Sequence, residues 1–171
     1  MVALLDGQPR LLNLKQILDA FLRHRREVVT RRTVFELKKA RERGHLLEGL
    51  AVALSNVDEI IALIKAAPTP AVAKDAIMAK VWRSQLVEEM LSRAMADANA
   101  LRPDGLAEDF GLRAQGYRLS DAQAQAILEL RLQRLTGLEQ EKIVEEYKEV
   151  IDKIIDYLDI LANPERITLI I

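Results

Sequence analysis

Tyrosine is one residue type in this sequence that could form a covalent intermediate, because a tyrosine hydroxyl with a neighbouring base can act as a nucleophile. The three tyrosines are Tyr117, Tyr147 and Tyr157. Tyr147 falls on an apolar helical repeat and Tyr157 lies beside it, which predicts packing roles for both. Tyr117 lies in a stretch rich in glycine, with no base nearby in the sequence. The tyrosines therefore do not indicate a nucleophilic site.

Acid–base and metal chemistry have equally little support. The sequence has no cysteine, which excludes a thiol nucleophile and a cysteine-based metal site, and its only histidines are His24 and His45. Adjacent acidic pairs such as Glu88–Glu89 are typical of solvated helix faces. The sequence contains neither a phosphate-binding glycine loop nor a Gly-x-Ser-x-Gly motif. We expect no catalytic residue, no cofactor-binding residue and no metal ligand in this chain.

Charge is the most informative chemical feature. Residues 23–43 hold nine Lys or Arg against three Asp or Glu, and residues 139–159 hold eight Asp or Glu against three Lys. The basic run could contact DNA phosphates, or it could be neutralised by the acidic run of the same chain. The net charge of −1 favours neutralisation within the chain. Both runs indicate long helices, which we expect to pair in antiparallel orientation.

The elements that would position these charges are mostly helical. Hydrophobic residues make up 50% of the 171 residues and aromatic residues 4%, and glycine and proline are few. We predict an all-α fold: a long antiparallel two-helix coiled coil with a small helical globular domain at its tip, preceded by a short β-hairpin with an Asp6-Gly7 turn. The predicted segments are the hairpin (1–12), the outgoing helix (13–54), the tip domain (55–119), the returning helix (120–161) and the start of a following segment (162–171).

A heptad repeat predicts which side chains pack between the two long helices. The expected packing positions are Leu14, Leu18, Phe21, Val28 and Phe35 on the first helix and Val144, Tyr147, Ile151, Ile154, Leu158 and Leu161 on the last. If Leu54 lies near Gln123, the antiparallel register places Phe35 near Lys142 and Arg25 near Asp152. The apolar positions would provide most of the cohesion, and the charges would fix the orientation.

Local signals predict where the helices begin, end and bend. Asn13 is an expected N-cap, Thr69 with Pro70 is another, and Asn56-x-x-Glu59 and Ser120-x-x-Gln123 resemble capping boxes. The helix from Ser120 is expected to reach Leu161 with an interruption at Thr136-Gly137. We expect residues 99–119 to be mostly loop. Glycines within the long helices are candidate flex points, namely Gly44, Gly49 and Gly137.

The segment from Ser120 to Leu138 is apolar on more faces than one intrachain contact requires. Either the short tip helices cover all of it, or a second copy of the chain does. On the second interpretation the candidate dimer interface consists of Leu119, Ala122, Gln123, Ala126, Ile127, Leu130 and Arg131.

Two segments carry a resemblance to a known family. Residues 124–139 read AQAILELRLQRLTGLE, and residues 23–33 read RHRREVVTRRT. Together with Gly7-Gln8-Pro9 and Asn13-Leu14-Lys15, they resemble the A subunits of bacterial DNA gyrases, which are type IIA topoisomerases. The resemblance covers nearly the whole chain.

The resemblance implies a coiled-coil arm that carries the exit gate, closed by a homodimer through the tip. It implies a cytoplasmic protein without membrane contact, which works with a gyrase B subunit on double-stranded DNA. ATP and Mg²⁺ would bind through that B subunit, not to this chain. The family's nucleophilic tyrosine lies between an arginine and a threonine, whereas Tyr117 here follows Gly116, so the resemblance places no catalytic tyrosine in this chain. The alternatives are a topoisomerase IV arm and a stand-alone helical scaffold with no role on DNA.

Overall fold

The computed structural model describes residues 1–93, 98–130 and 137–171, with side chains described outside 94–99 and 131–139. The chain divides into two compact units. The first comprises Met1–Leu37 and Asp156–Ile171, and the second comprises Lys38–Ile155. The two longest helices, α1 (Leu14–Ser55) and α6 (Gly137–Ala162), each contribute residues to both units.

The first unit begins with the predicted hairpin. Strand β1 (Val2–Leu5) pairs antiparallel with β2 (Gln8–Leu11), and Leu5 lies opposite Gln8. The two turn residues Asp6 and Gly7 have φ angles of 52° and 78°. A two-residue turn with both φ values positive matches the twist of the flanking strands, and Asp-Gly is a preferred pair there. The hairpin prediction is confirmed.

Helix α1 begins at the predicted cap. The Gln16 backbone N–H donates to Asn13 Oδ1 at 2.8 Å, and the Asn13 N–H donates to Gln16 Oε1 at 3.0 Å. This reciprocal pair satisfies two backbone donors and fixes where the helix starts. At the other end of the first unit, α7 (Pro164–Ile170) begins with proline at its first position. Arg166 of α7 forms ion pairs with Asp156 and Asp159, and Arg26 of α1 donates to Thr168 Oγ1 at 2.9 Å.

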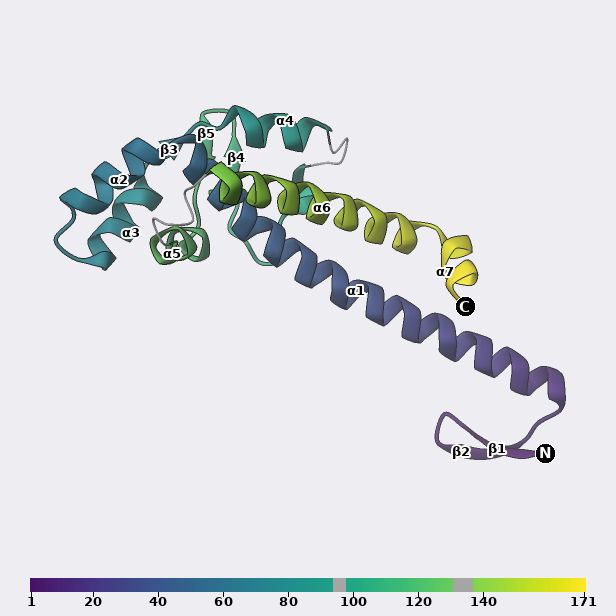
Figure 1. Ribbon diagram of the computed structural model, residues 1–171. Coiled ribbons are helices and arrows are strands. Elements are labelled where there is room, and N and C mark those ends of the chain that lie inside the picture. Colours follow the sequence, from purple (N-terminus) through teal and green to yellow (C-terminus); the bar gives the residue numbers. More distant parts are fainter. Residues whose placement is uncertain (94–97, 131–136) are drawn as a thin grey trace. The chain divides into compact units, whose positions relative to one another are not determined.

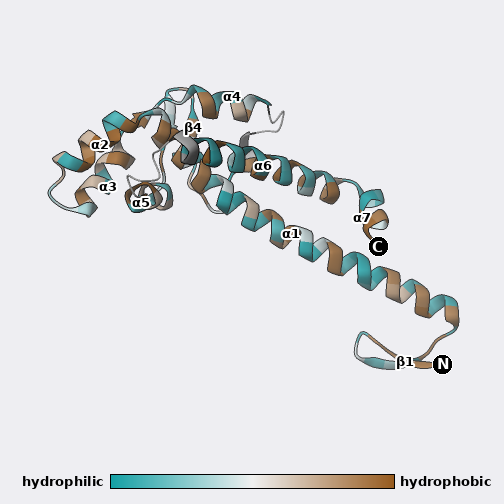
Figure 2. Ribbon diagram, viewed as in Figure 1, coloured by the Kyte–Doolittle hydropathy of each residue, from teal (hydrophilic) through white to brown (hydrophobic). Residues whose placement is uncertain are grey.

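The buried side of α1 in the first unit differs from the predicted one. The expected positions Leu14, Leu18, Phe21, Val28 and Phe35 are 37–63% exposed. Val29, Thr33 and Leu37 are buried instead. Thr33 can occupy a buried position because its hydroxyl donates to the Val29 carbonyl at 2.8 Å. A search for apolar repeats passes over a buried threonine and so selects the wrong face. Figure 2 shows brown and teal residues alternating along α1.

In the second unit, the last turns of α1 run antiparallel to the first part of α6 (Figure 1). Gly44 lies against Val150 and Ile154, and Arg43 pairs with Glu146 at 2.7 Å. The antiparallel orientation is as predicted. Three of the expected α6 packing positions are buried, namely Tyr147, Ile151 and Ile154.

The predicted register is wrong. Leu54 lines a pocket with Gln140 and Val144, whereas the α1 residues that meet Gln123 in the printed contacts are Gly49 and His45. The expected pairs Phe35–Lys142 and Arg25–Asp152 each join a residue of the first unit to one of the second, and they stay predictions. The error arose because the helix that begins after Ser120 was assumed to continue directly into the acidic helix.

That helix, α5 (Asp121–Glu129), ends instead at Glu129, where Leu130 has extended backbone angles of φ −67° and ψ 116°. Helix α6 begins anew at Gly137. The expected interruption at Thr136 lies outside the described residues. Helices α2 (Val57–Ala66) and α3 (Pro70–Ala79) follow α1 in the chain, and α3 contacts both α2 and α5. Lys74 of α3 forms an ion pair with Asp121 of α5 at 2.6 Å.

The caps of these short helices are mostly as expected. Thr69 Oγ1 accepts a hydrogen bond from the Val72 N–H at 3.3 Å, and Pro70 occupies the first helical position. Asn56 precedes α2 but makes no capping hydrogen bond with its side chain, so the predicted capping box there is wrong. Its amide donates to the carbonyls of Val52 and Arg83 and so joins the end of α1 to the segment before α4 (Gln85–Arg93).

A small sheet was not predicted. Strands β3 (Val81–Trp82), β5 (Gly116–Arg118) and β4 (Gly111–Arg113) form an antiparallel sheet in that spatial order, and the 3₁₀ turn η1 (Ala98–Leu101) lies between β3 and β4 in the sequence. Part of the segment expected as loop is therefore strand. Trp82, opposite Tyr117, is buried and donates from its indole N–H to the Ile77 carbonyl at 3.0 Å. Strands of two or three residues are too short to show an alternating pattern in the sequence.

Candidate functional site

Helix α5 is the predicted interface helix, and its first turn is held by the predicted capping box. The Gln123 N–H donates to Ser120 Oγ at 3.4 Å, and the Ser120 N–H donates to Gln123 Oε1 at 2.9 Å. Both side chains are buried. The capping box therefore belongs to the core of the second unit and fixes where α5 starts.

The same glutamine fastens α5 to α1 and to β5. Gln123 Nε2 donates to the His45 carbonyl and to the Tyr117 hydroxyl, both at 2.7 Å. His45 Nε2 in turn lies 2.7 Å from Ser120 Oγ. The α1 backbone approaches closely here, because a Cβ atom built on Gly49 would lie 2.8 Å from Gln123 Cβ. One buried amide thus joins α5 to two other elements, and the orientation of α5 is set by hydrogen bonds as well as by apolar packing.

The structure separates six of the seven candidate interface residues into two groups. Leu119, Gln123 and Ile127 are 0–4% exposed, so the chain's own core takes them up and they are not available to a partner. Ala122 is exposed, and Ala126 and Leu130 are partly exposed. Arg131 lies outside the described residues. The interface prediction is therefore restricted to the outer side of α5.

Two of the three candidate flex points have a packing role. Gly49 makes room for Gln123, and a Cβ atom on Gly44 would lie 3.2 Å from Val150 Cγ1. Both lie within the continuous helix α1. Gly137 is the first residue of α6. That any of them flexes stays a prediction.

Electrostatics single out two groups that sequence reasoning missed, the buried His45 and the partly exposed Glu48. Burial lowers the pKa of His45 to about 4, and the positive charge of Arg102 acts in the same direction. Burial raises the pKa of Glu48 to about 7, against the opposing effects of the Tyr117 and Tyr147 hydroxyls and of Arg102. His45 and Glu48 are separated by about one helical turn, which places them on the same face of α1. The spacing of His45 and Glu48 along α1 was the signal in the sequence from which this pair could have been found.

The tyrosines are not poised for nucleophilic attack. Tyr117 and Tyr147 are each 1% exposed, and burial together with Glu48 raises the pKa of both hydroxyls. A phenol with a raised pKa is a weaker nucleophile at neutral pH because less of it is ionised. Tyr157 is partly exposed on α6. The buried pair therefore acts in packing, and the Tyr117 hydroxyl also accepts a hydrogen bond from Gln123.

The basic run on α1 is largely exposed within the first unit. Residues 21–28 are all exposed, and Arg31 forms an exposed ion pair with Glu27 at 2.9 Å. Arg26 is engaged with Thr168. Arg26 and Arg31 therefore have partners within the chain. Contact of this run with DNA phosphates stays a prediction.

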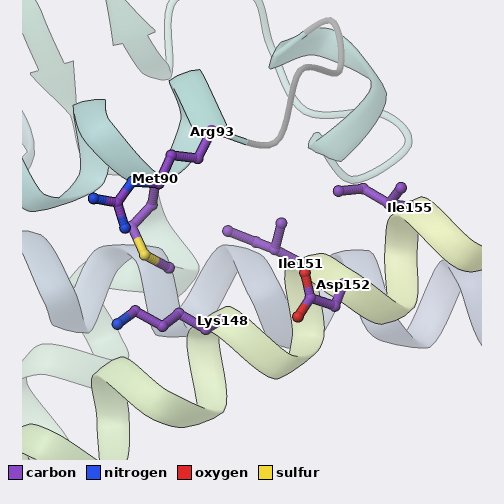
Figure 3. A pocket seen from close by; sticks show the side chains of 6 residues that line it. All are labelled: Met90, Arg93, Lys148, Ile151, Asp152 and Ile155. Atoms are coloured by element: carbon purple, nitrogen blue, oxygen red, sulfur yellow. The ribbon is translucent and has the colours of Figure 1, made fainter.

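The second unit also has a surface pocket of about 220 Å³ between α4 and α6. Met90, Ile151 and Ile155 line it together with Arg93, Lys148 and Asp152 (Figure 3). The described residues contain no cluster of three or more histidines, cysteines or acids that could hold a metal ion. Across the part of the chain that the structure describes, no helix has the length and hydropathy of a membrane span.

Comparison with known proteins shows the family of the chain. The family model for the A subunit of DNA gyrase/topoisomerase IV matches residues 1–171. The DNA gyrase A subunit of Neisseria gonorrhoeae is 62% identical over 100% of this chain and 19% of its own length, and that of Pseudomonas aeruginosa is 61% identical over 98% of this chain and 18% of its own length. The DNA gyrase A subunit of Escherichia coli is 60% identical over 86% of this chain and 17% of its own length.

The chain thus spans about a fifth of the length of these relatives. The resemblance seen in the basic run and in the α5 segment therefore extends over all 171 residues of this chain. A stand-alone scaffold outside this family is not favoured. The chain belongs to the family of DNA gyrase and topoisomerase IV A subunits.

Proposed function

We propose that this chain is a dimerisation region of a gyrase-type A subunit, in which two copies meet through the outer side of α5. The observation that carries the proposal is the 62% identity to a DNA gyrase A subunit over the full chain. The fold adds a physical reason for choosing α5, because that helix is anchored on its inner side and offers small side chains on its outer side.

The outer side of α5 suits close contact between two helices. Ala122 is exposed and Ala126 is partly exposed, with Leu130 following at the end of the helix. Alanine spaced by four residues lies on one face of a helix and lets a second backbone approach closely. In a two-fold dimer the same patch is used by both copies, so residues close to the axis would lie near their own counterparts.

A symmetric disulfide tests the placement directly. The sequence has no cysteine, so Ala126→Cys introduces a single thiol per chain. If α5 lies at the two-fold axis, mild oxidation converts this variant to a covalent dimer, because disulfides require Cβ atoms about 3.5–4.5 Å apart. The matched control is Ala62→Cys on the exposed side of α2. Equal cross-linking of the two variants would show that collision, rather than α5 pairing, forms the bond.

A charge at the same position tests the energetics. Ala126→Glu buries two carboxylates near the axis of a dimer, so we expect the dissociation constant to rise at least about tenfold. Ala62→Glu, at an exposed helical position outside the proposed interface, leaves the dimer unchanged. Sedimentation velocity over a concentration series measures both. A dimer of unchanged strength in Ala126→Glu contradicts the placement on α5.

In the larger protein, we infer that this region forms part of a coiled-coil arm ending in the exit gate of a type IIA topoisomerase. The parent complex would act on double-stranded DNA in the cytoplasm, with ATP and Mg²⁺ bound through a B subunit. The support is family membership together with the antiparallel packing of α1 against α6 in the second unit. The gate opens in this proposal by separation of the two α5 helices.

A further inference from the structure

Helix α5 carries apolar side chains around most of its circumference. Ala124 and Ile127 are buried, whereas Ala126 and Leu128 are partly exposed. Apolar packing has no directional preference, and successive residues of a helix are about 100° apart. Turned one way about its axis, α5 would therefore bury Leu128, and turned the other way it would bury Ala126. Hydrophobicity alone specifies the rotational setting of α5 only weakly.

Gln123 is the polar member of the three buried residues of α5, and its contacts are directional. Its Oε1 accepts from the Ser120 N–H at 2.9 Å, and its Nε2 donates to the His45 carbonyl and to the Tyr117 hydroxyl, both at 2.7 Å. Both ends of the amide are thus engaged. A turn of α5 would break the bonds to α1 and β5 and would leave buried polar groups without partners. Each such loss shifts an equilibrium by roughly five- to a hundredfold.

The amide of Gln123 is seated on α1 at a gap that Gly49 leaves in the helix surface. A Cβ atom built on Gly49 would lie 2.8 Å from both Cβ and Cγ of Gln123 and 3.1 Å from its Cδ. His45, whose carbonyl accepts from the amide, lies about one helical turn before Gly49. The Gln123 side chain therefore fits against one turn of α1 because residue 49 has no side chain. A buried polar group in such a seat specifies one arrangement among several that bury similar apolar surface.

The other contacts of α5 specify its rotation less sharply. Lys74 of α3 pairs with Asp121 at 2.6 Å, but the Asp121 side chain is largely exposed. An exposed ion pair contributes little to stability, and the flexible lysine stem can follow the carboxylate through a rotation of the helix. Ala124 and Ile127 add buried surface without a preferred direction. The rotational setting of α5 therefore depends chiefly on Gln123.

We propose that Gln123 is the positioning residue of the α5 interface: its amide, seated on α1 at Gly49, sets the rotation of α5 so that Ala122 and Ala126 face a second copy. This inference rests on the proposed dimerisation through α5. Gln123 is 0% exposed and is not itself available to the second copy, so it acts through the helix that carries the interface. It also ties that helix to α1, so a change in the α1 turn at Gly49 changes the setting of the interface.

Gln123→Met tests the positioning role, because methionine has nearly the same length and no amide. Since the sequence has no cysteine, Ala124→Cys supplies a single thiol on the buried side of α5. This thiol should react slowly with an aromatic disulfide reagent while Gln123 is present. Adding Gln123→Met should raise its rate at least about tenfold, because α5 is then free to turn in its seat. The matched control, Gln85→Met on α4, removes an exposed amide that donates to Glu89 and should leave the rate unchanged.

A buried thiol elsewhere in the second unit separates positioning from a general loss of stability. Ala51→Cys places it at another fully buried alanine, on α1, and its rate should change little when Gln123→Met is added. Equal acceleration at both positions would overturn the proposal, and so would an Ala124→Cys thiol that stays protected in the Gln123→Met chain. If Ala124→Cys fails to fold, amide hydrogen exchange of the Gln123→Met chain makes the same comparison between residues 124–129 and residues 47–53.

Sedimentation velocity links the positioning role to the dimer. Gln123→Met should raise the dissociation constant at least about tenfold, and Gln85→Met should leave it unchanged. If Gln123→Met exposes the Ala124→Cys thiol but the dimer keeps its strength, the interface on α5 is refuted and the proposed function with it. If the Ala124→Cys thiol stays protected and the Ala126→Cys cross-link persists in the Gln123→Met chain, the positioning role alone is overturned.

Discussion

Adding one methyl group to Gly49 should destabilise the protein more than adding it to Gly44, although both lie within α1. In an unconstrained helix either change to alanine would stabilise by about 1 kcal/mol through helix propensity. At Gly49 the new Cβ would lie 2.8 Å from both Cβ and Cγ of Gln123, closer than packed carbon atoms can lie. Gln123 cannot simply rotate away, because its amide is fixed to His45 and Tyr117.

The magnitude follows from three contributions. Overpacking a core position costs about 1–3 kcal/mol, and displacing the Gln123 amide from its buried acceptors costs about 1–3 kcal/mol more. After subtraction of the gain of about 1 kcal/mol in helix propensity, we expect Gly49→Ala to lower the free energy of unfolding by about 1–5 kcal/mol. For a protein of this size that corresponds to a decrease in Tm of roughly 2–20 °C.

Gly44→Ala is the matched control. Its Cβ would meet only the ends of the Val150 and Ile154 side chains, at 3.2 and 3.5 Å. Small movements of those side chains relieve the contact, so we expect a change between neutral and about 1 kcal/mol of stabilisation. Urea denaturation followed by Trp82 fluorescence measures both variants. If Gly49→Ala is as stable as Gly44→Ala, the close packing of α1 against α5 at Gln123 is refuted.

Two further substitutions test individual contacts of the second unit. Thr69→Ala removes the cap of α3 and should lower the free energy of unfolding in urea by about 1 kcal/mol. Thr69→Ser keeps the hydroxyl and should lower it much less. Equal losses in the two variants would refute the capping role. Trp82→Phe removes the indole hydrogen bond to the Ile77 carbonyl and leaves a smaller ring in the core. It should lower the free energy of unfolding by about 2–4 kcal/mol, as measured by denaturation followed by circular dichroism. A loss under about 0.5 kcal/mol would contradict the buried placement of Trp82.

Most features that depend on a few neighbouring residues were predicted correctly from the sequence, the capping box at Asn56 being the exception because its amide bonds to Val52 and Arg83. The Asp6-Gly7 turn and the caps at Asn13, Thr69 and Ser120 each rest on side-chain chemistry within three residues. The length of α1 followed from the absence of proline up to its end. Such turn and cap motifs can be interpreted from the sequence alone, because they do not depend on distant contacts.

Features that depend on distant partners were missed or misplaced. The buried face of α1 includes Thr33, whose burial depends on a hydrogen bond to its own helix and on packing that no repeat reveals. The register between α1 and α6 failed because the end of α5 at Glu129 carries no proline or glycine in the sequence. The sheet around Tyr117 was missed because each of its strands has only two or three residues.

Helix α5 shows both outcomes at once. It was predicted to be apolar on more than one face, and its capping box was predicted correctly. The division between its inner and outer sides was not, since Gln123 and Ile127 are buried while Ala122 is exposed. A polar glutamine at a fully buried position is explained by its hydrogen-bond partners from α1, β5 and the start of α5, which only the three-dimensional structure brings together.

Sedimentation equilibrium of the unaltered 171-residue chain tests the central claim most directly. Its mass of 19.3 kDa makes monomer and dimer easy to distinguish. If two copies associate through α5, the chain sediments as a dimer at micromolar concentration and dissociates on dilution. A single species of 19.3 kDa up to high micromolar concentration would contradict the claim that this region closes on a second copy of itself.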